Sequence, residues 1–156
     1  MTRDLSIEEA ETILKEAEFG HIGCNDGFNT YIFSTNYVYD GKCILCQSMP
    51  ESKIIVMREN NRVCFQVESV NKLNDMASVT ILGEYVEIKK VRERYDALKT
   101  FVEKMMHLNV SEEINYLHSQ NKFSLNKKNV FYKPVFYKIY IQEIKGSAII
   151  NNHTQE

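Results

Sequence analysis

The chain has 156 residues and a mass of 18.2 kDa, and 44% of its residues are hydrophobic, which is enough to build one core in a single domain, residues 1–156. Its 19 basic and 21 acidic residues give a formal net charge of −2. This balance excludes the basic surface that nucleic acid requires and the polybasic face that binds a membrane, so we expect neither partner.

The first predicted element is an amphipathic helix over about residues 6–18. Ser6 and Glu9 have the spacing of a capping box, which marks a helix start. The apolar residues that recur on one helical face are Ile7, Ala10, Ile13, Leu14 and Ala17. Because this segment does not resemble a signal peptide and no apolar run is long enough to cross a bilayer, we expect a cytoplasmic protein.

Three short strands are predicted next, at residues 21–24, 30–39 and 42–47. Turn residues separate them, and the Asp40-Gly41 pair between the second and third is typical of a tight hairpin. We therefore expect an antiparallel meander, with the second and third strands as direct neighbours.

All four cysteines lie in strand-like apolar runs, at Cys24, Cys43, Cys46 and Cys64. This position indicates small buried side chains in a reducing compartment. A metal or dithiol role for the C-x-x-C pair Cys43 and Cys46 is the alternative. It is disfavoured because residues three apart in a strand point to opposite faces, and no metal site is expected.

Residues 48–54 join the third strand to a short helix predicted over residues 52–60. The start of a helix carries unpaired N–H groups and the positive end of the helix dipole, both of which favour an anion. Ser52 adds a hydroxyl group and Lys53 an ammonium group at this point. The pattern predicts a phosphate site, and the alternative is an ordinary helix cap beside a solvated lysine.

Strands are also predicted at residues 62–68, 77–88 and 135–142. Gly83, inside the longest of these, indicates a bulge or the close approach of a backbone or a ligand. The sum is about six strands joined by loops too short for repeated βαβ crossovers. This predicts a mainly β protein with flanking helices (α+β), built on a six-stranded antiparallel barrel.

A second helix is predicted over residues 91–107, and a polar stretch at 109–129 is expected to form a short helix and a loop. The apolar stripe of the helix, expected to pack in the core or against another subunit, consists of Val91, Tyr95, Leu98, Val102 and Met105. Met105, Met106 and His107 are an alternative haem-ligand neighbourhood, without a paired pocket signal.

This order of elements, together with Lys53 and residues 36–42, 60–68 and 78–83, resembles the pyridoxamine 5′-phosphate oxidase-related FMN-binding split-barrel family. The likeness is greatest to its nitroimidazole-reductase (Nim-type) branch. The resemblance implies an FMN-dependent oxidoreductase that acts on a small molecule, with NAD(P)H or another reductant. It also implies a homodimer with FMN held at the subunit interface.

The resemblance assigns Ser52 and Lys53 to the phosphate, residues 34–36 to the strand along the flavin, and Ser78 to the opposite subunit. The full set of implied cofactor-binding residues is Ser34, Thr35, Asn36, Cys46, Gln47, Ser48, Ser52, Lys53 and Ser78. No catalytic residue is assigned, because a flavin itself transfers hydride and electrons. Candidate aromatic walls of the site are Tyr31, Phe33, Tyr37, Tyr132 and Phe136.

Three positions depart from the family pattern. Cys46 stands where the Nim-type branch has a histidine, Ser34 where a proline is usual, and Glu51 where a glycine precedes the phosphate lysine. Glu51 places an anion close to the expected phosphate. The alternatives are therefore a non-catalytic flavin- or haem-binding sensor of the same fold, and a barrel that has lost its cofactor.

Overall fold

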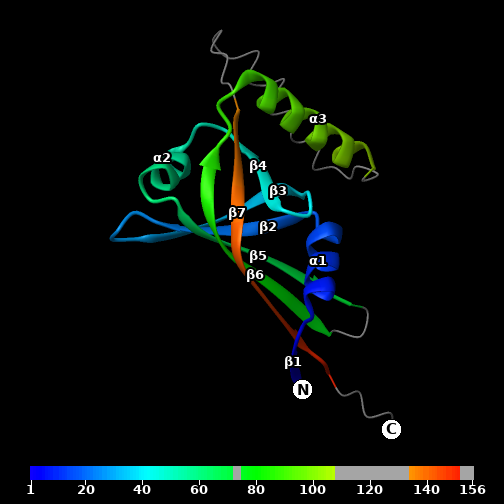
Figure 1. The fold of residues 1–156 in the computed structure, drawn as a ribbon. Helices are drawn as coiled ribbons and strands as arrows, with labels where there is room; N and C mark the ends of the chain where they lie inside the picture. Colours follow the sequence, from blue (N-terminus) through cyan, green and yellow to red (C-terminus); the bar gives the residue numbers. More distant parts are fainter. Residues whose placement is uncertain (72–74, 108–133, 152–156) are drawn as a thin grey trace, which may run out of the picture.

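The computed structural model describes residues 1–71, 75–107 and 134–151. These residues form a barrel of strands with helices on its outside (Figure 1). In chain order the elements are β1 (Thr2–Asp4), α1 (Ile7–Glu16), β2 (Phe19–Asn25), β3 (Thr30–Tyr39), β4 (Cys43–Ser48), α2 (Ser52–Glu59), β5 (Arg62–Val70), β6 (Met76–Glu87), α3 (Val91–His107) and β7 (Val135–Ile149).

Six strands close the barrel in the order β7-β4-β3-β2-β5-β6, and a further pairing of β6 with β7 completes the ring. Every neighbouring pair is antiparallel, which confirms the predicted barrel and the β2-β3-β4 meander. The barrel is split because β3 pairs with β4 only at Tyr37–Tyr39, whereas its first half pairs with β2. The predicted hairpin turn is also confirmed, with Gly41 at a φ of 92°.

Helix α1 begins as predicted, at a complete capping box. The Glu9 N–H donates to the Ser6 hydroxyl at 3.2 Å, and the Ser6 N–H donates to the Glu9 carboxylate at 2.8 Å. The helix buries Ala10 and Leu14 against the barrel core. The Tyr37 hydroxyl of β3 donates to the carbonyl oxygen of Leu14 at 2.6 Å, which ties the helix to the barrel.

The predicted irregularity at Gly83 is confirmed. The β6–β7 register shifts between Leu82, which pairs with Glu143, and Gly83, which pairs with Ile141. A Cβ at Gly83 would lie 2.5 Å from the carbonyl oxygen of Tyr140, so no larger residue fits there without moving the backbone.

The strand prediction was incomplete in two respects, the end of β7 and the presence of β1. Strand β7 runs to Ile149, well beyond the predicted end at residue 142, and is therefore longer than β6. Its second half stays in the sheet because it pairs with residues 76–82 of β6 and with β1, a short strand that the sequence did not indicate.

Helix α3 lies beside the barrel (Figure 1). The face that it turns inward differs from the one predicted. Ala97 and Phe101 are buried against Phe136 of β7, in a small second core. The prediction that the apolar stripe packs in the core was wrong for the side chains that the structure describes. Their exposed fractions are 82% for Val91, 68% for Tyr95, 44% for Leu98 and 47% for Val102. The Met105 side chain and the segment 109–129 lie outside the described residues.

Candidate functional site

The predicted phosphate site lies where β4 ends at Ser48 and α2 begins at Ser52. Glu51 caps the helix with its backbone alone and makes no side-chain cap bond. Among the described residues, the Ser52 hydroxyl and the first backbone N–H groups of the helix have no hydrogen-bond partner, while the Ile54 N–H donates to the carbonyl oxygen of Glu51 at 3.0 Å. These open donors could bind an anion, as the N–H groups at the start of a helix commonly do.

The ammonium group of Lys53 lies between an acid and an aromatic ring. Its Nζ is 3.3 Å from a carboxylate oxygen of Glu51 and 4.3 Å from the ring centroid of Phe33. The Lys53 side chain is 34% exposed and that of Glu51 is 50% exposed, so solvent reaches both. The Glu51 carboxylate therefore partly neutralises the charge of the Lys53 ammonium group.

The predicted residues on β3 and β4 lie on the two strands that part at the split. Along β3, Thr35 and Asn36 directly precede Tyr37, which pairs with Cys46 at the edge of the β3–β4 ladder. Along β4, Gln47 and Ser48 follow Cys46 and pair with β7. The Thr35 hydroxyl donates to the Asn36 carbonyl at 3.0 Å, and the Ser48 hydroxyl donates to the Met49 carbonyl at 3.0 Å.

These β3 and β4 side chains remain within reach of solvent. Ser34 is exposed, while Thr35, Asn36, Gln47 and Ser48 are half-buried. The fold thus brings eight of the nine predicted residues, including Cys46, into one region around the split and the start of α2.

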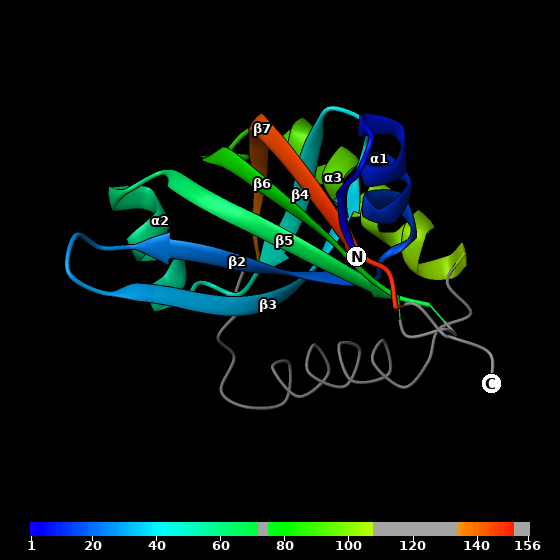
Figure 2. The same cartoon turned by 90° about the horizontal axis from the view of Figure 1, so that it is seen from below.

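Ser78 is the predicted residue that lies elsewhere. It is close to the start of β6, opposite Glu68 of β5 and Ser147 of β7, and its hydroxyl is 3.4 Å from that of Ser147. Figure 2 shows this end of β6 at the opposite side of the barrel from α2. Within one chain Ser78 does not join the others, and its assignment to an opposite subunit stays a prediction.

Cys46 differs from the other predicted residues because its thiol is completely buried. Burial raises the pKa of this thiol well above its ordinary value, which keeps it protonated. Its neighbour Tyr137 is also buried, and the Tyr137 hydroxyl has no hydrogen-bond partner of acceptable geometry, although Cys46 and Thr35 lie beside it. Cys46 as a whole has no exposed surface, so its place among the cofactor-binding residues stays a prediction.

All four cysteines are free thiols, as the sequence indicated, and only Cys64 is not fully buried. The Cys43 thiol donates to the Asp40 carboxylate at 3.3 Å.

Of the candidate aromatic walls, Phe33 lies under Lys53, whereas Tyr37 and Phe136 belong to the core and Tyr132 is outside the described residues. Met106 is 77% exposed, and the side chains of Met105 and His107 are not described.

The corner fits a phosphate group with one disagreement. It offers a hydroxyl, open N–H groups and an ammonium group at one point, which is the donor set that a phosphate ester needs. The disagreement is the Glu51 carboxylate, which competes for Lys53. Because Glu51 is half exposed, it can turn into solvent at the cost of one surface ion pair, about 0.2–1 kcal/mol.

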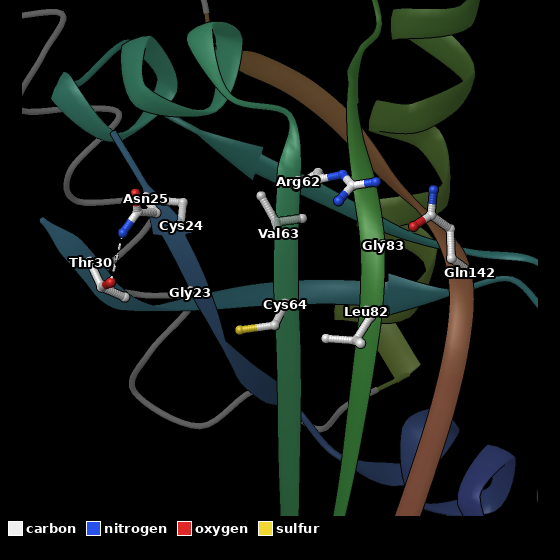
Figure 3. A pocket seen from close by; sticks show the side chains of 10 residues that line it. All are labelled: Gly23, Cys24, Asn25, Thr30, Arg62, Val63, Cys64, Leu82, Gly83 and Gln142. Carbon is white, nitrogen blue, oxygen red and sulfur yellow. Dashed lines mark hydrogen bonds between the residues drawn. The ribbon is translucent and has the colours of Figure 1, made fainter. Parts of the chain in front are cut away.

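The sequence did not indicate a groove of about 400 Å³ on the outer face of the barrel (Figure 3). Residues of β2, β5, β6 and β7 and the first residue of β3 line it, among them Asn25, Thr30, Arg62, Cys64, Leu82 and Gln142. No local pattern could have revealed it, because the strands come together only when the barrel closes.

The closed ring of six strands and the helices outside it form a split β-barrel, with the corner at the start of α2. A family model described as pyridoxamine 5′-phosphate oxidase matches residues 6–147. The chain belongs to this family. No helix in the described part of the chain is both long enough and apolar enough to span a membrane.

Similar proteins agree with this fold. A curated relative, an uncharacterized protein of Rhizobium meliloti, is 29% identical over 86 residues, which are 55% of this chain and 57% of that protein. The match thus spans little more than half of the relative's length. Among solved structures, an FAD-binding protein of Mesorhizobium loti is 22% identical with a TM-score of 0.72, covering 96% of this chain and 99% of that one.

A structure described as a putative 5-nitroimidazole antibiotic resistance protein of Bacteroides thetaiotaomicron is also similar. It is 20% identical with a TM-score of 0.71, and the match covers 95% of this chain and 87% of that one. At these identities the likeness shows the fold.

Proposed function

We propose that this protein binds FMN and is an FMN-dependent oxidoreductase that acts on a small molecule. The observation that carries the proposal is the start of α2, where Ser52, open N–H groups and Lys53 converge in a barrel of the pyridoxamine 5′-phosphate oxidase family. The description of a similar structure as FAD-binding supports a flavin.

In this proposal the phosphate lies against Ser52 and Lys53, and the ring system lies along the split. There it is bordered by Ser34, Thr35 and Asn36 on one strand and by Cys46, Gln47 and Ser48 on the other. Ser78 is supplied by the second subunit of a homodimer. Its distance from α2 within one chain supports this arrangement, because one subunit alone would leave that side of the cofactor open.

A bound flavin supplies hydride and electron transfer, with NAD(P)H as the proposed reductant. The residues of this chain hold and orient it: Lys53 offsets the phosphate charge, and the hydroxyls and amides along the split offer hydrogen bonds. Four free thiols support a reducing, cytoplasmic location.

A second candidate is a non-catalytic protein of the same fold that stores or senses flavin or haem. Two observations favour it: Glu51 already pairs with Lys53, and Cys46, which stands in place of a histidine, is completely buried in the core. Reoxidation after reduction by NAD(P)H distinguishes the two, since only the enzyme turns over. The absorbance of the purified protein distinguishes flavin from haem and from an empty barrel.

The test of the proposal is the Lys53→Ala variant. We expect its free energy of FMN binding to weaken by about 1.5–3 kcal/mol, the contribution of a charge-assisted hydrogen bond, as measured by fluorescence titration. Lys99→Ala, which removes an exposed lysine from α3, is the matched control and should bind FMN like the wild type. Equal affinities of the two variants would show that the phosphate does not lie at this corner.

A further inference from the structure

The groove on the outer face of the barrel is lined by different residues from those of the corner at α2. The corner is built from residues 34–36 of β3, from β4 and from the start of α2, whereas the groove is lined by residues of β2, β5, β6 and β7 and by Thr30 at the opposite end of β3. Its volume of about 400 Å³ is within the range of small-molecule sites. Nothing in the proposed function uses this space.

The β6–β7 bulge determines which side chain borders the groove. Leu82 pairs with Glu143 and Gly83 pairs with Ile141, so Gln142 is an extra residue with no partner across the ladder. A bulge of this kind re-aims the side chain of the extra residue. Figure 3 shows the Gln142 amide and the Arg62 guanidinium directed toward each other across β6 at Gly83.

Arg62 forms no ion pair with the described acids nearest to it in the sheet. Glu84 pairs with Arg62 in register, but its carboxylate accepts from the Asn61 amide at 2.6 Å. Glu143, beside the bulge, pairs with Lys145 at 3.0 Å. None of the ion pairs among the described residues includes Arg62, and its side chain makes no hydrogen bond to them.

The part of the groove beside Arg62 is small and apolar, while Asn25 and Thr30, joined by a hydrogen bond of 2.9 Å, lie on the side away from Gln142 (Figure 3). Gly23 forms part of it, and a Cβ at this position would lie 2.6 Å from the Cys64 sulfur, so the glycine leaves space for the thiol. Leu82, which is 45% exposed, adds an apolar wall. A ligand that fits has an apolar body and one polar end near Arg62.

We propose that this groove binds a small carboxylate with a flat apolar body. The two N–H edges of the Arg62 guanidinium match the two oxygens of a carboxylate, and the Gln142 amide supplies one further donor. A planar acid suits this pair better than a phosphate because the space beside Arg62 is lined by Leu82, Gly23 and the Cys64 thiol. The site goes beyond the proposed flavin function and is independent of it.

The test uses benzoate as the probe and the full chain as purified. Titration followed by NMR should shift the backbone signals of Arg62, Gly83 and Gln142. Benzamide, which has the same shape without the charge, should bind at least tenfold more weakly. Arg62→Met should weaken benzoate binding by roughly tenfold or more, the effect of losing a charge-assisted bond.

Arg92→Met is the matched control, since it removes an exposed arginine from α3, and it should bind benzoate like the wild type. The Cys64 thiol gives a second readout: benzoate should slow its alkylation by iodoacetamide in the wild type but not in Arg62→Met. Cys64→Ser identifies the labelled site.

The proposal is overturned if benzamide binds as well as benzoate, if the two arginine variants bind equally, or if benzoate leaves Cys64 alkylation unchanged. A Cys64 thiol that does not react at all in the native protein would also overturn it, because the groove would then be closed. None of these measurements depends on flavin, so their failure is distinct from failure of the Lys53 test.

Discussion

Lys53 and Glu51 show how two neighbouring residues determine the character of the proposed phosphate site. Lys53 supplies the cation at the start of α2, and Glu51 reduces the net charge of the corner through an ion pair of 3.3 Å. Both side chains are in contact with solvent, so the pair contributes little to stability, and an incoming phosphate can replace the Glu51 carboxylate.

The variant Glu51→Gln tests this competition. Removing the carboxylate should strengthen FMN binding by about 0.2–1 kcal/mol, the free energy of an exposed ion pair, and the gain should shrink as salt screens the charges. Isothermal titration of both proteins with FMN at low and high salt measures the effect. Glu59→Gln, at the far end of α2, is the control, and an unchanged or weaker affinity of Glu51→Gln would contradict the competition.

Single residues also show which local signals were sufficient. Gly83 was predicted to mark a bulge, because a glycine inside a strand pattern usually permits a close approach, and the Tyr140 carbonyl is that approach. Arg62 and Gln142 carried no such signal. They are eighty residues apart in the chain and become neighbours only through the strand order of the barrel.

At the scale of elements, α1 is the helix that local sequence specifies best. Its capping box is extended by Arg3 of β1, whose guanidinium donates to both oxygens of the Glu9 carboxylate at 3.0 and 2.7 Å. The Arg3 hydrogen bond and then the Ser6 N–H lower the pKa of Glu9 from its ordinary 4.5 to about 2. The ionised carboxylate therefore helps to hold the start of the helix.

This lowered pKa predicts a pH dependence with a defined sign. The Glu9 contribution to the free energy of unfolding should be complete above about pH 4.5 and should be lost as the pH falls toward about 2, because protonation removes the acceptor. Urea unfolding of wild type and Glu9→Gln across this range measures it. The two curves should converge at the acid end.

Glu8→Gln changes the neighbouring residue in the same first turn and serves as the control. It should be parallel to the wild type over the same pH range. A constant difference between wild type and Glu9→Gln at every pH would refute the role of the ionised carboxylate.

Helix α3 depends more on tertiary contacts. The Lys104 ammonium donates to the Tyr37 carbonyl at 2.7 Å and to the Ala17 carbonyl at 3.4 Å, and it lies 4.4 Å from the centroid of the Tyr37 ring. Burial lowers the pKa of Lys104. The helical period alone predicted the helix but not the face that it turns inward. A period of apolar residues does not show that a lysine with such partners can take a partly buried position.

At the scale of the whole molecule, apolar side chains are exposed on α3 and on the outside of the barrel. The stripe of α3 and Ile32 of β3 are accessible in the chain taken alone. The proposed homodimer would cover part of this surface and bring Ser78 of one subunit toward the flavin of the other.

We expect the purified protein to have twice the mass of the 18.2 kDa chain, with one FMN bound per chain. Light scattering coupled to gel filtration gives the mass, and absorbance gives the FMN content. Lys53→Ala should keep the dimeric mass while binding FMN more weakly, because in this proposal Lys53 contacts the phosphate and Ser78 is the residue assigned to the partner subunit. A flavin-loaded monomer would contradict the assignment of Ser78 to a second subunit.

The sequence by itself determined the elements and much of the topology. Alternation with period two, helical spacing and turn residues are local properties, so the β2-β3-β4 meander, the start of α1 and the barrel class could be predicted from them. The start of α2 was equally visible, because a helix end and its first side chains are adjacent in the chain.

Only the tertiary structure decided what those elements bring together. Barrel closure placed Arg62 beside Gln142, buried the Cys46 thiol, turned Phe101 of α3 inward and extended β7 past its predicted end. Each of these depends on contacts between strands and helices distant in the chain, whose free energy no local pattern records.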